Sequence, residues 1–294
     1  MDFIELLKVI FLGIVEGITE WLPISSTGHM ILVDEFIKFK VSNDFLQMFL
    51  VVIQLGAIMA VVFIYFKKLW PFVYRKEVHM PYDKRKFTDY FYYLWYKFCD
   101  EDKFMLWFKI AFACLPAMIV GLCFDDFIEA HFNTWYVVSA MLIIYGILFI
   151  LIETKFKSNP KYKTLESLDF KTALLIGIFQ MMAVIPGTSR SGATILGGML
   201  VGTSRLVATE FTFFLAIPVM FGASLLKVLK FGFVFTTAEL ITLAVGMSVA
   251  FVVSILAIKF LVGYLKKNDF KAFGIYRIVL GIAVFAYFGV KMFL

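Results

Sequence analysis

The chain of 294 residues is 62% hydrophobic and only 17% charged, and its mean hydropathy is +0.89. Water-soluble globular proteins are about half apolar, so this composition excludes a purely soluble fold. A net charge of +6 would suit a nucleic-acid partner, but the basic residues gather between apolar segments, which is the charge pattern that orients membrane proteins. Three scattered cysteines give no disulfide framework. We expect an integral membrane protein with no nucleic-acid partner.

The first apolar segment, at about residues 2–40, is interrupted in its middle by charged residues, Pro, Gly and Ser. Such interruptions are typical of broken or re-entrant helices. No small-residue cleavage site follows the apolar start, and Glu5 and Lys8 already interrupt it. We therefore interpret the segment as part of the mature chain and not as a signal peptide.

The interruption carries most of the reactive side chains of this segment. If the helix continues through Glu20, the carboxylates of Glu16 and Glu20 lie four residues apart on one face, where two charges do not form easily together and proton transfer is favoured. Each ionised group within a span costs about 2.5–3.5 kcal/mol, which packing alone hardly justifies. Pro23 ends the helix, and the hydroxyls of the next turn are available to a ligand. The residues concerned are Glu16, Glu20, Ser25, Ser26, Thr27 and His29.

Each of these residues also has a structural interpretation. The carboxylates could pair with bases elsewhere and only fix the packing of helices. The hydroxyls, taken singly, are more typical of helix caps. For His29, an interhelical hydrogen bond is as good an interpretation as catalysis. The proximity of all of them within fourteen residues favours a functional site.

Six uninterrupted stretches are long enough to cross a bilayer, because about 20 residues rising 1.5 Å each match a hydrocarbon core of about 30 Å. Lys and Arg residues place the loops 67–103 and 153–171, and the loop before the last span, in the cytoplasm. The loop 125–134 has acidic residues but no Lys or Arg, so we predict it and both termini outside. The loop 67–103 is also aromatic, which is typical of the membrane interface. The predicted spans are 45–66, 104–124, 135–152, 207–226, 238–258 and 273–293.

A second interrupted segment, at 171–204, contains a short stretch rich in glycine and hydroxyl side chains around Arg190. Its backbone can approach a ligand closely and leads into the N-terminus of a half-helix, which is a composition for anion binding. The planar fork of arginine favours phosphate as the anion. The alternative is a flexible hinge in which Arg190 pairs with Glu16 or Glu20. The stretch is Pro186, Gly187, Thr188, Ser189, Arg190, Ser191, Gly192, Ala193 and Thr194.

Three spans separate the two interrupted segments, and an odd number of crossings inverts the second segment relative to the first. Weak sequence similarity supports a repeat, with Ser26 aligned to Ser189 across one gap. We predict a single all-α integral membrane domain, 1–294, with six transmembrane helices and two re-entrant segments in an inverted repeat of 1–152 and 153–294. The re-entrant segments are expected to meet near the middle of the bilayer, where such folds place ligand sites.

At these motifs the chain resembles the bacterial undecaprenyl-diphosphatases, the membrane phosphatases linked to bacitracin resistance. The resemblance rests on Glu16-x-x-x-Glu20 with the following residues 22–29, on 51–56 and on 186–194. It implies hydrolysis of undecaprenyl diphosphate to the monophosphate and inorganic phosphate in the bacterial inner membrane. This reaction recycles the lipid carrier of cell-wall synthesis. The predicted external placement of the ends of the first interrupted segment suggests that the site opens to the outer face, where the substrate of this family is released.

The resemblance and the residue chemistry together suggest a role for each side chain. Glu20 is expected to activate a nucleophile, either Ser26 or water, and His29 to protonate the leaving oxygen or act as a second activator. Glu16 shares a proton with Glu20, or the two carboxylates hold a divalent cation, Mg or Ca, as the metal dependence of the family implies. Arg190 is expected to hold the diphosphate. The further expected diphosphate contacts are Gly187, Thr188, Ser189, Ser191, Ser25 and Thr27.

Two other functions agree with the predicted layout. A secondary transporter or flippase for an anionic or phosphate-bearing substrate also has inverted repeats and broken helices. A lipid-binding scaffold without turnover would explain the anion-binding stretch but not the carboxylate pair. We expect polyprenyl diphosphate and membrane lipids as partners and no organic cofactor, and the sequence leaves a homodimer open.

Overall fold

The structure, a computed structural model, describes residues 2–76, 87–155 and 159–293. Within those ranges all named elements are helices, and six are long and apolar enough to cross a membrane. These six, α3, α6, α7, α10, α11 and α12, correspond to the six predicted spans, so the predicted fold class is confirmed. The helices are α1 (Phe3–Thr19), α2 (Ser26–Phe36), α3 (Asn43–Ile64), α4 (Phe66–Leu69), α5 (Phe87–Phe98), α6 (Glu101–Phe132), α7 (Trp135–Lys155), α8 (Phe170–Met181), the 3-10 helix η1 (Met182–Val184), α9 (Arg190–Leu200), α10 (Arg205–Phe231), α11 (Thr237–Leu265) and α12 (Lys271–Phe293).

Several spans begin at a hydroxyl side chain that caps the helix. Ser42, Ser204 and Thr236 each accept a hydrogen bond from the backbone N–H three residues later, at 3.3, 3.3 and 3.2 Å. Thr236 also belongs to a capping box, because its own N–H donates to the Glu239 carboxylate at 2.8 Å. Caps satisfy N–H groups that the first turn of a helix leaves without a partner, so local sequence decides where these spans start.

The first interrupted segment is a hairpin in which a turn at residues 20–25 joins α1 to α2. The Lys8 ammonium in α1 donates to the carbonyl of Lys38, which follows α2. The N–H of Lys40 donates to the Glu5 carboxylate at 3.1 Å. The segment therefore returns to the end at which it entered, and it is re-entrant as predicted.

The second hairpin consists of α8, η1 and α9, with its turn at residues 185–189. Its two ends are also held together. The N–H of Tyr162, before α8, donates to the carbonyl of Gly202, after α9, at 3.1 Å, and the N–H of Ser204 donates back to the Tyr162 carbonyl at 2.9 Å. The second segment is re-entrant as well.

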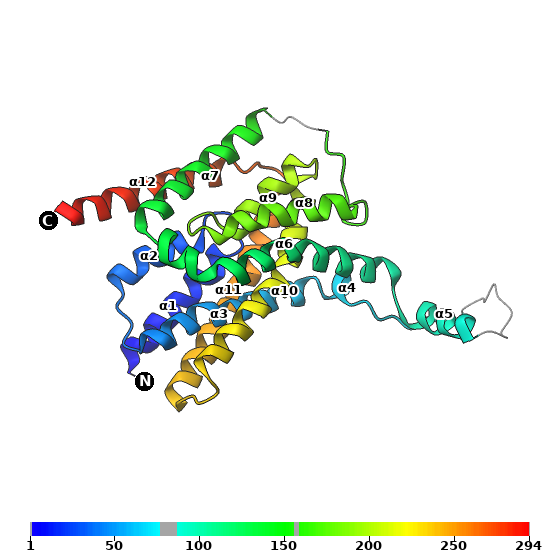
Figure 1. Cartoon of the computed structure of the whole chain (residues 1–294), viewed down its shortest axis with the longest axis horizontal. Coiled ribbons are helices and arrows are strands. Elements are labelled where there is room, and N and C mark those ends of the chain that lie inside the picture. Colours follow the sequence, from blue (N-terminus) through cyan, green and yellow to red (C-terminus); the bar gives the residue numbers. More distant parts are fainter. Residues whose placement is uncertain (1, 77–86, 156–158, 294) are drawn as a thin grey trace.

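The two hairpins enter the bundle from opposite ends. Glu35, at the end of α2, pairs with Lys291 at the end of α12, and Figure 1 shows both chain termini on that side. At the other end of α12, Glu153 near the end of α7 pairs with Arg205, the first residue of α10. Glu153 also accepts from the N–H of Phe270, just before α12, at 3.1 Å, so these helix ends meet beside the second hairpin. Because α12 runs from one group of contacts to the other, the hairpins open in opposite directions.

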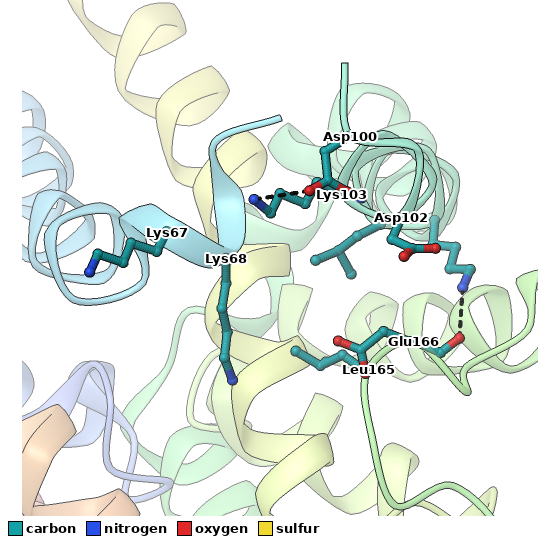
Figure 2. Close-up of a pocket in the computed structure, with 9 residues that line it drawn as sticks. Lys67, Lys68, Asp100, Asp102, Lys103, Leu165 and Glu166 are labelled. Atoms are coloured by element: carbon teal, nitrogen blue, oxygen red, sulfur yellow. Dashed lines mark hydrogen bonds and ion pairs between the residues drawn. The ribbon is translucent and has the colours of Figure 1, made fainter. Parts of the chain in front are cut away.

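The basic loops that we placed on one side of the membrane lie at one end of the bundle. Two of them, 67–103 and 153–171, meet with α6 around a pocket, which Figure 2 shows and whose volume is about 240 Å³. Here the Lys109 ammonium donates to the carbonyl of Glu166 at 3.4 Å, and Lys68 pairs with Glu210 of α10 at 2.8 Å. The assignment of this end to the cytoplasm and the division of the chain into two repeats stay predictions.

Two loops contain more regular structure than we predicted. α6 continues to Phe132, so most of the predicted loop 125–134 is helical. The loop 67–103 contains α4 and α5, and Phe72 pairs with Cys99 in an isolated antiparallel bridge. Hydropathy marks the edge of the lipid, whereas a helix ends only where its backbone hydrogen bonds end. Spans read from hydropathy therefore underestimate helix length.

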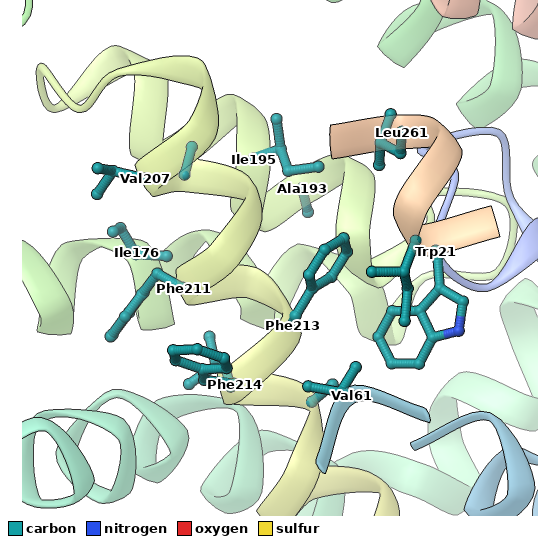
Figure 3. Packing of buried hydrophobic residues seen from close by; sticks show 14 of the residues in the cluster. Trp21, Val61, Ile176, Ala193, Ile195, Val207, Phe211, Phe213, Phe214 and Leu261 are labelled. Atoms are coloured by element: carbon teal, nitrogen blue, oxygen red, sulfur yellow. The ribbon is translucent and has the colours of Figure 1, made fainter. Parts of the chain in front are cut away.

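The largest apolar core surrounds α9 and α10 and also receives the first turn. Figure 3 shows Trp21, from that turn, beside Phe213 of α10. The two ring centroids are 5.2 Å apart at an interplanar angle of 89°, and the Trp21 side chain is fully buried. An edge-to-face aromatic pair of this kind is directional, so it helps to fix how the first turn approaches the second half of the chain.

Candidate active site

The two turns are joined directly by hydrogen bonds. Ser191, in the first turn of α9, donates from its hydroxyl to the backbone carbonyl of Glu20 at 3.1 Å. The Arg190 guanidinium donates to one carboxylate oxygen of Glu20 at 2.6 Å, and these two side chains are only 11% and 7% exposed. The two interrupted segments therefore meet, as the repeat predicted.

Glu20 lies at the centre of the site because it has a second partner. The Ser26 hydroxyl donates to its other carboxylate oxygen at 3.3 Å. One carboxylate thus links the hydroxyl at the start of α2 to the guanidinium at the start of α9. The charge-assisted contact holds Arg190, and the contact with Ser26 is the geometry of a hydroxyl beside a general base.

Arg190 adopts the pairing with Glu20 that we considered as a structural alternative, but this pairing does not use all its donors. One terminal nitrogen donates to the carbonyl of Thr212 at 3.0 Å, whereas Nε has no partner among the described residues. A guanidinium carries five N–H donors. Arg190 therefore keeps donors for an anion while Glu20 fixes its orientation.

The two turns share one uncommon backbone conformation. Ser25 has a φ of 71° and Ser189 a φ of 70°, and no other non-glycine residue in the described ranges has a positive φ. Each serine caps the helix that follows, accepting from the N–H of Gly28 at 3.4 Å or of Gly192 at 3.2 Å. Strained residues persist only where their surroundings hold them, and they concentrate at functional sites.

This match corrects our alignment of the two halves. The counterpart of Ser189 is Ser25, not Ser26. This pair has the same spacing as Gly13 and Gly177, so no gap is needed between them, and Pro23 then lies opposite Gly187 and not opposite Pro186. The sequence misled because Ser25 and Ser26 are identical neighbours, and only the backbone conformation identifies the capping residue. Ser26 consequently occupies the same helix position as Arg190.

Several buried polar atoms at or near the turns have no hydrogen-bond partner within the described part of the chain. Buried polar groups are nearly always paired, so a concentration of unpaired ones indicates a place for a polar ligand. Glu16 and Gln180, which occupy equivalent positions in α1 and α8, are both among them. The atoms are Glu16 Oε1, Trp21 Nε1, both amide atoms of Gln180, Thr188 Oγ1, Arg190 Nε and Arg277 Nε.

Two predicted residues do not join this centre. The His29 Nδ1 lies 2.7 Å from the carbonyl of Ser25, so it must donate, and Nε2 is left to accept from the Tyr276 hydroxyl at 2.7 Å. The His29 ring thus forms the interhelical contact that was its structural alternative. Thr27 is exposed and has no side-chain hydrogen bond to the described residues. Neither contacts Glu20 in the ranges described.

The glycine and hydroxyl residues of the second turn have separate roles. Gly187 has a φ of 89°, and a Cβ there would lie 2.6 Å from the carbonyl oxygen of Val138, so only glycine suits this position. Thr188 is fully buried. The hydroxyls of Ser189 and Ser191 lie 3.2 Å apart, so the capping serine and the contact to the first turn form one network.

Two residues of α12 at the site were missed by the sequence reasoning. Tyr276 contacts His29, and Arg277 donates to carbonyls of both turns. A signal for Arg277 was available, because a charge within the predicted span 273–293 is costly and such charges are usually functional. Tyr276 gave no signal, since tyrosine is common near the ends of membrane helices, where they reach the interface.

The suitability of the site for a divalent cation can be tested from its oxygens. Mg and Ca take six or more oxygen ligands, although Mg is often held by one or two carboxylates together with substrate phosphates. Glu20 already uses both carboxylate oxygens, whereas Glu16 keeps one buried oxygen without a partner. The described residues contain no cluster of three or more acidic, His or Cys side chains. The residues therefore suit a cation only if the substrate supplies further oxygens.

The fold and the site define a class of protein. Two re-entrant turns inside a helical membrane bundle bring a carboxylate, a serine hydroxyl and an arginine together, which suits an anionic headgroup carried on a lipid. Residues 9–283 match the family described as bacitracin resistance protein BacA, and the chain belongs to this family.

Close relatives cover nearly the whole chain. A protein of Enterococcus faecalis is 57% identical over 97% of both chains, and one of Lachnoclostridium phytofermentans is 59% identical over 98% of both. A protein of Desulfitobacterium hafniense is 56% identical over 99% of both. All three are named undecaprenyl-diphosphatase.

Proposed function

We propose that this protein hydrolyses undecaprenyl diphosphate to undecaprenyl phosphate and inorganic phosphate, which recycles the lipid carrier of cell-wall synthesis and confers bacitracin resistance. One observation carries the proposal: a single buried carboxylate, Glu20, contacts a serine hydroxyl on one side and an arginine on the other. The names of the relatives support it.

The chemistry assigns a role to each partner of Glu20. Arg190, with N–H groups at the start of α9, holds the terminal phosphate and offsets the charge of the transition state. Glu20 takes the proton of Ser26 as the serine oxygen bonds to phosphorus and the bond to the leaving monophosphate breaks. Water then releases phosphate from the serine. Direct attack by a water that Glu20 activates is the alternative.

A matched pair of hydroxyl variants separates these two routes. Ser26→Ala removes the hydroxyl that contacts Glu20, whereas Thr27→Ala removes the neighbouring exposed one. If Ser26 is the nucleophile, a phosphoserine trapped by acid quench disappears in Ser26→Ala together with nearly all activity, and Thr27→Ala stays active. Mild loss in Ser26→Ala would establish attack by water.

Glu16 and His29 receive supporting roles in this proposal. Glu16 shares a proton with Glu20 or, together with phosphate oxygens, holds a Mg or Ca ion, which would supply neutralisation of charge on the phosphoryl group. His29 acts as a second activator that takes a proton at Nε2, which now accepts from the Tyr276 hydroxyl, and the imidazolium so formed then protonates the leaving oxygen. Titration with a chelator, followed by return of each metal, tests the cation. Unchanged turnover in excess chelator would remove it from the proposal.

The localisation we propose is the bacterial inner membrane, with the site open to the outer face. The basic loops at one end of the bundle support this orientation. Single cysteines at Asn43 and Asn268, two exposed residues at opposite ends, test it in a background without Cys99, Cys114 and Cys123. An impermeant thiol reagent should label the first from outside and the second only from inside. Labelling of both from one side would overturn the topology.

The rival function is a transporter or flippase, and turnover without a membrane separates the two. Purified protein in detergent is incubated with a polyprenyl diphosphate, and released phosphate is measured. A phosphatase needs neither a gradient nor a sealed membrane, whereas a transporter or a scaffold releases no phosphate. The homodimer stays an open prediction, which light scattering of the same preparation tests.

A further inference from the structure

Arg277 of α12 contacts both re-entrant turns with one guanidinium. Its side chain is fully buried. One terminal nitrogen donates to the carbonyl of Pro23, in the first turn, at 3.3 Å. The other donates to the carbonyls of Gly187 and Thr188, in the second turn, at 2.9 and 2.8 Å. The two turns are therefore held against each other by a residue that belongs to neither.

The charge of Arg277 is not balanced by an acid. Within the described ranges it makes no ion pair, and its hydrogen-bond acceptors are all backbone carbonyls. Arg190 and Arg205, by contrast, pair with Glu20 and Glu153. A buried cation without a counter-ion is costly, so a requirement other than stability should maintain it.

Packing does not explain an arginine at this position either. α7 and α12 cross symmetrically at two glycines: a Cβ on Gly146 would lie 2.7 Å from the carbonyl oxygen of Gly274, and the reverse distance is also 2.7 Å. Three residues after each glycine stand Phe149 and Arg277, and both are fully buried. In α7 an apolar ring fills the equivalent position. An arginine in α12 is therefore not a demand of the helix crossing.

The contacts of Arg277 also set the direction of backbone donors. In a trans peptide unit the C=O and the N–H point in opposite directions. The carbonyl of Thr188 is directed at Arg277, so the N–H of Ser189 in the same peptide unit is directed away from it. A Cβ on Gly192 would lie only 3.1 Å from the Arg277 guanidinium, which places this charge beside the first turn of α9.

From these observations we propose that Arg277 is a positioning residue of the phosphatase site that favours the diphosphate substrate over the monophosphate product. It orients the second turn and adds a second positive charge beside that of Arg190. A diphosphate carries more negative charge than a monophosphate, and charges interact strongly where water is excluded. The uncompensated cation therefore stabilises the bound substrate more than the bound product. This inference rests on the proposed hydrolysis.

The test compares Arg277→Gln and Arg277→Lys with Arg205→Gln, which removes a guanidinium from a structural ion pair outside the site. For monodisperse protein in detergent, kcat and KM are measured with polyprenyl diphosphate. Inhibition constants are measured for a non-hydrolysable methylene-diphosphonate analogue and for the polyprenyl monophosphate. The ratio of the two inhibition constants reports selectivity, and a merely structural role would not change it.

We expect Arg277→Gln to weaken the diphosphonate at least about 10-fold and the monophosphate by less than about 3-fold, because one charge is lost from a water-excluded site. Arg277→Lys should keep the selectivity but lose about 10-fold in kcat, since an ammonium cannot hold both turns. Arg205→Gln should leave both quantities unchanged.

Each other outcome overturns the inference. An unchanged selectivity ratio in folded Arg277→Gln removes the electrostatic role. If that variant does not fold, the lysine variant decides: wild-type kcat removes the positioning role, and failure of both variants to fold makes Arg277 a structural residue only. A wild-type protein that releases no phosphate overturns the proposed function instead, so the two failures are distinguishable.

Discussion

The two re-entrant turns have the same backbone but carry different chemistry. Both begin a half-helix at a serine with positive φ, and both serines cap that helix through the N–H three residues later. At the next position the first turn has Ser26 and the second has Arg190. The repeated backbone thus presents a hydroxyl from one half and a cation from the other. Neither half contains a complete phosphatase site, and Glu20 joins them.

The surroundings of the two half-helices differ as well. Most of α9 is buried, from Ser191 to Gly198, whereas α2 is mostly half-exposed. The cation is therefore carried by a helix enclosed in protein, and the hydroxyl by a helix nearer the lipid. A substrate with a long apolar tail can approach past α2 while its headgroup reaches the fixed cation on α9.

The most severe way to break this arrangement is to remove the carboxylate that joins the turns. Glu20→Gln keeps the size of the side chain but removes the base, and we expect turnover to fall about 10²- to 10⁴-fold. Phosphate release under saturating substrate measures it. Glu35→Gln, which breaks an ion pair at the end of the bundle, is the control and should keep turnover. Near-normal turnover in Glu20→Gln would exclude Glu20 from catalysis.

Arg190→Lys tests what the second turn contributes to the site. Lysine keeps the charge but loses the planar fork that contacts Glu20 and Thr212 and, in the proposed reaction, the phosphate, so kcat/KM should fall about 10- to 100-fold. Because the two residues act through one contact, Glu20→Gln and Arg190→Lys combined should lose less than the sum of the single effects. A double-mutant cycle measures this coupling, and additive losses would contradict it.

The shared backbone can be tested at both capping serines. Alanine removes the cap and keeps the positive φ, so Ser25→Ala and Ser189→Ala should each lower the free energy of unfolding by about 1–2 kcal/mol. Ser25→Gly and Ser189→Gly should lower the free energy of unfolding by only about a few tenths of a kcal/mol, because glycine tolerates the positive φ. Thermal unfolding in detergent measures both pairs. An equal effect of alanine and glycine at either site would show that the conformation is not a constraint.

The smallest effect that we expect is a loss of stability at the start of the second segment, which has a helix cap that the start of the first segment lacks. Asp169 accepts from the N–H of Thr172 at 2.7 Å, whereas Asp2, before α1, makes no side-chain cap. Hydrogen bonds from the Thr172 backbone and hydroxyl and from Tyr162 lower the pKa of Asp169 to about 2. Its contribution is therefore complete above the unfolded pKa near 4 and is lost as the pH falls toward 2.

We expect Asp169→Asn to lower the melting temperature by about 2–4 °C at neutral pH, and by less as the pH approaches 2. Asp2→Asn should leave the melting temperature unchanged. Melting curves recorded from pH 6 down to the lowest pH that the detergent permits check both statements. If the loss of melting temperature in Asp169→Asn does not depend on pH, the negative charge of Asp169 does not contribute to the cap.

The transmembrane spans were predictable because each is a continuous apolar stretch, long enough to be recognised from the local sequence alone. The re-entrant segments were also readable, since Pro23 and the residues around Arg190 interrupt otherwise apolar runs. The alignment of the repeats failed at Ser25 and Ser26, because two neighbouring serines are identical in sequence and only the structure shows which of them has the positive φ and caps the helix. The sequence could not decide between a catalytic role and an interhelical hydrogen bond for His29, because its partner Tyr276 is distant in sequence.

The sequence by itself determined the membrane fold, the two interrupted segments and the kinds of side chain that could handle a phosphate, because composition and spacing act over one or two turns of a helix. Only the tertiary structure decided that Glu20 joins Ser26 to Arg190 and that Arg277 lies between the turns. Those contacts link residues far apart in the chain. They depend on the crossing of α7 with α12 and on the burial of Trp21 against α10, which no local pattern encodes.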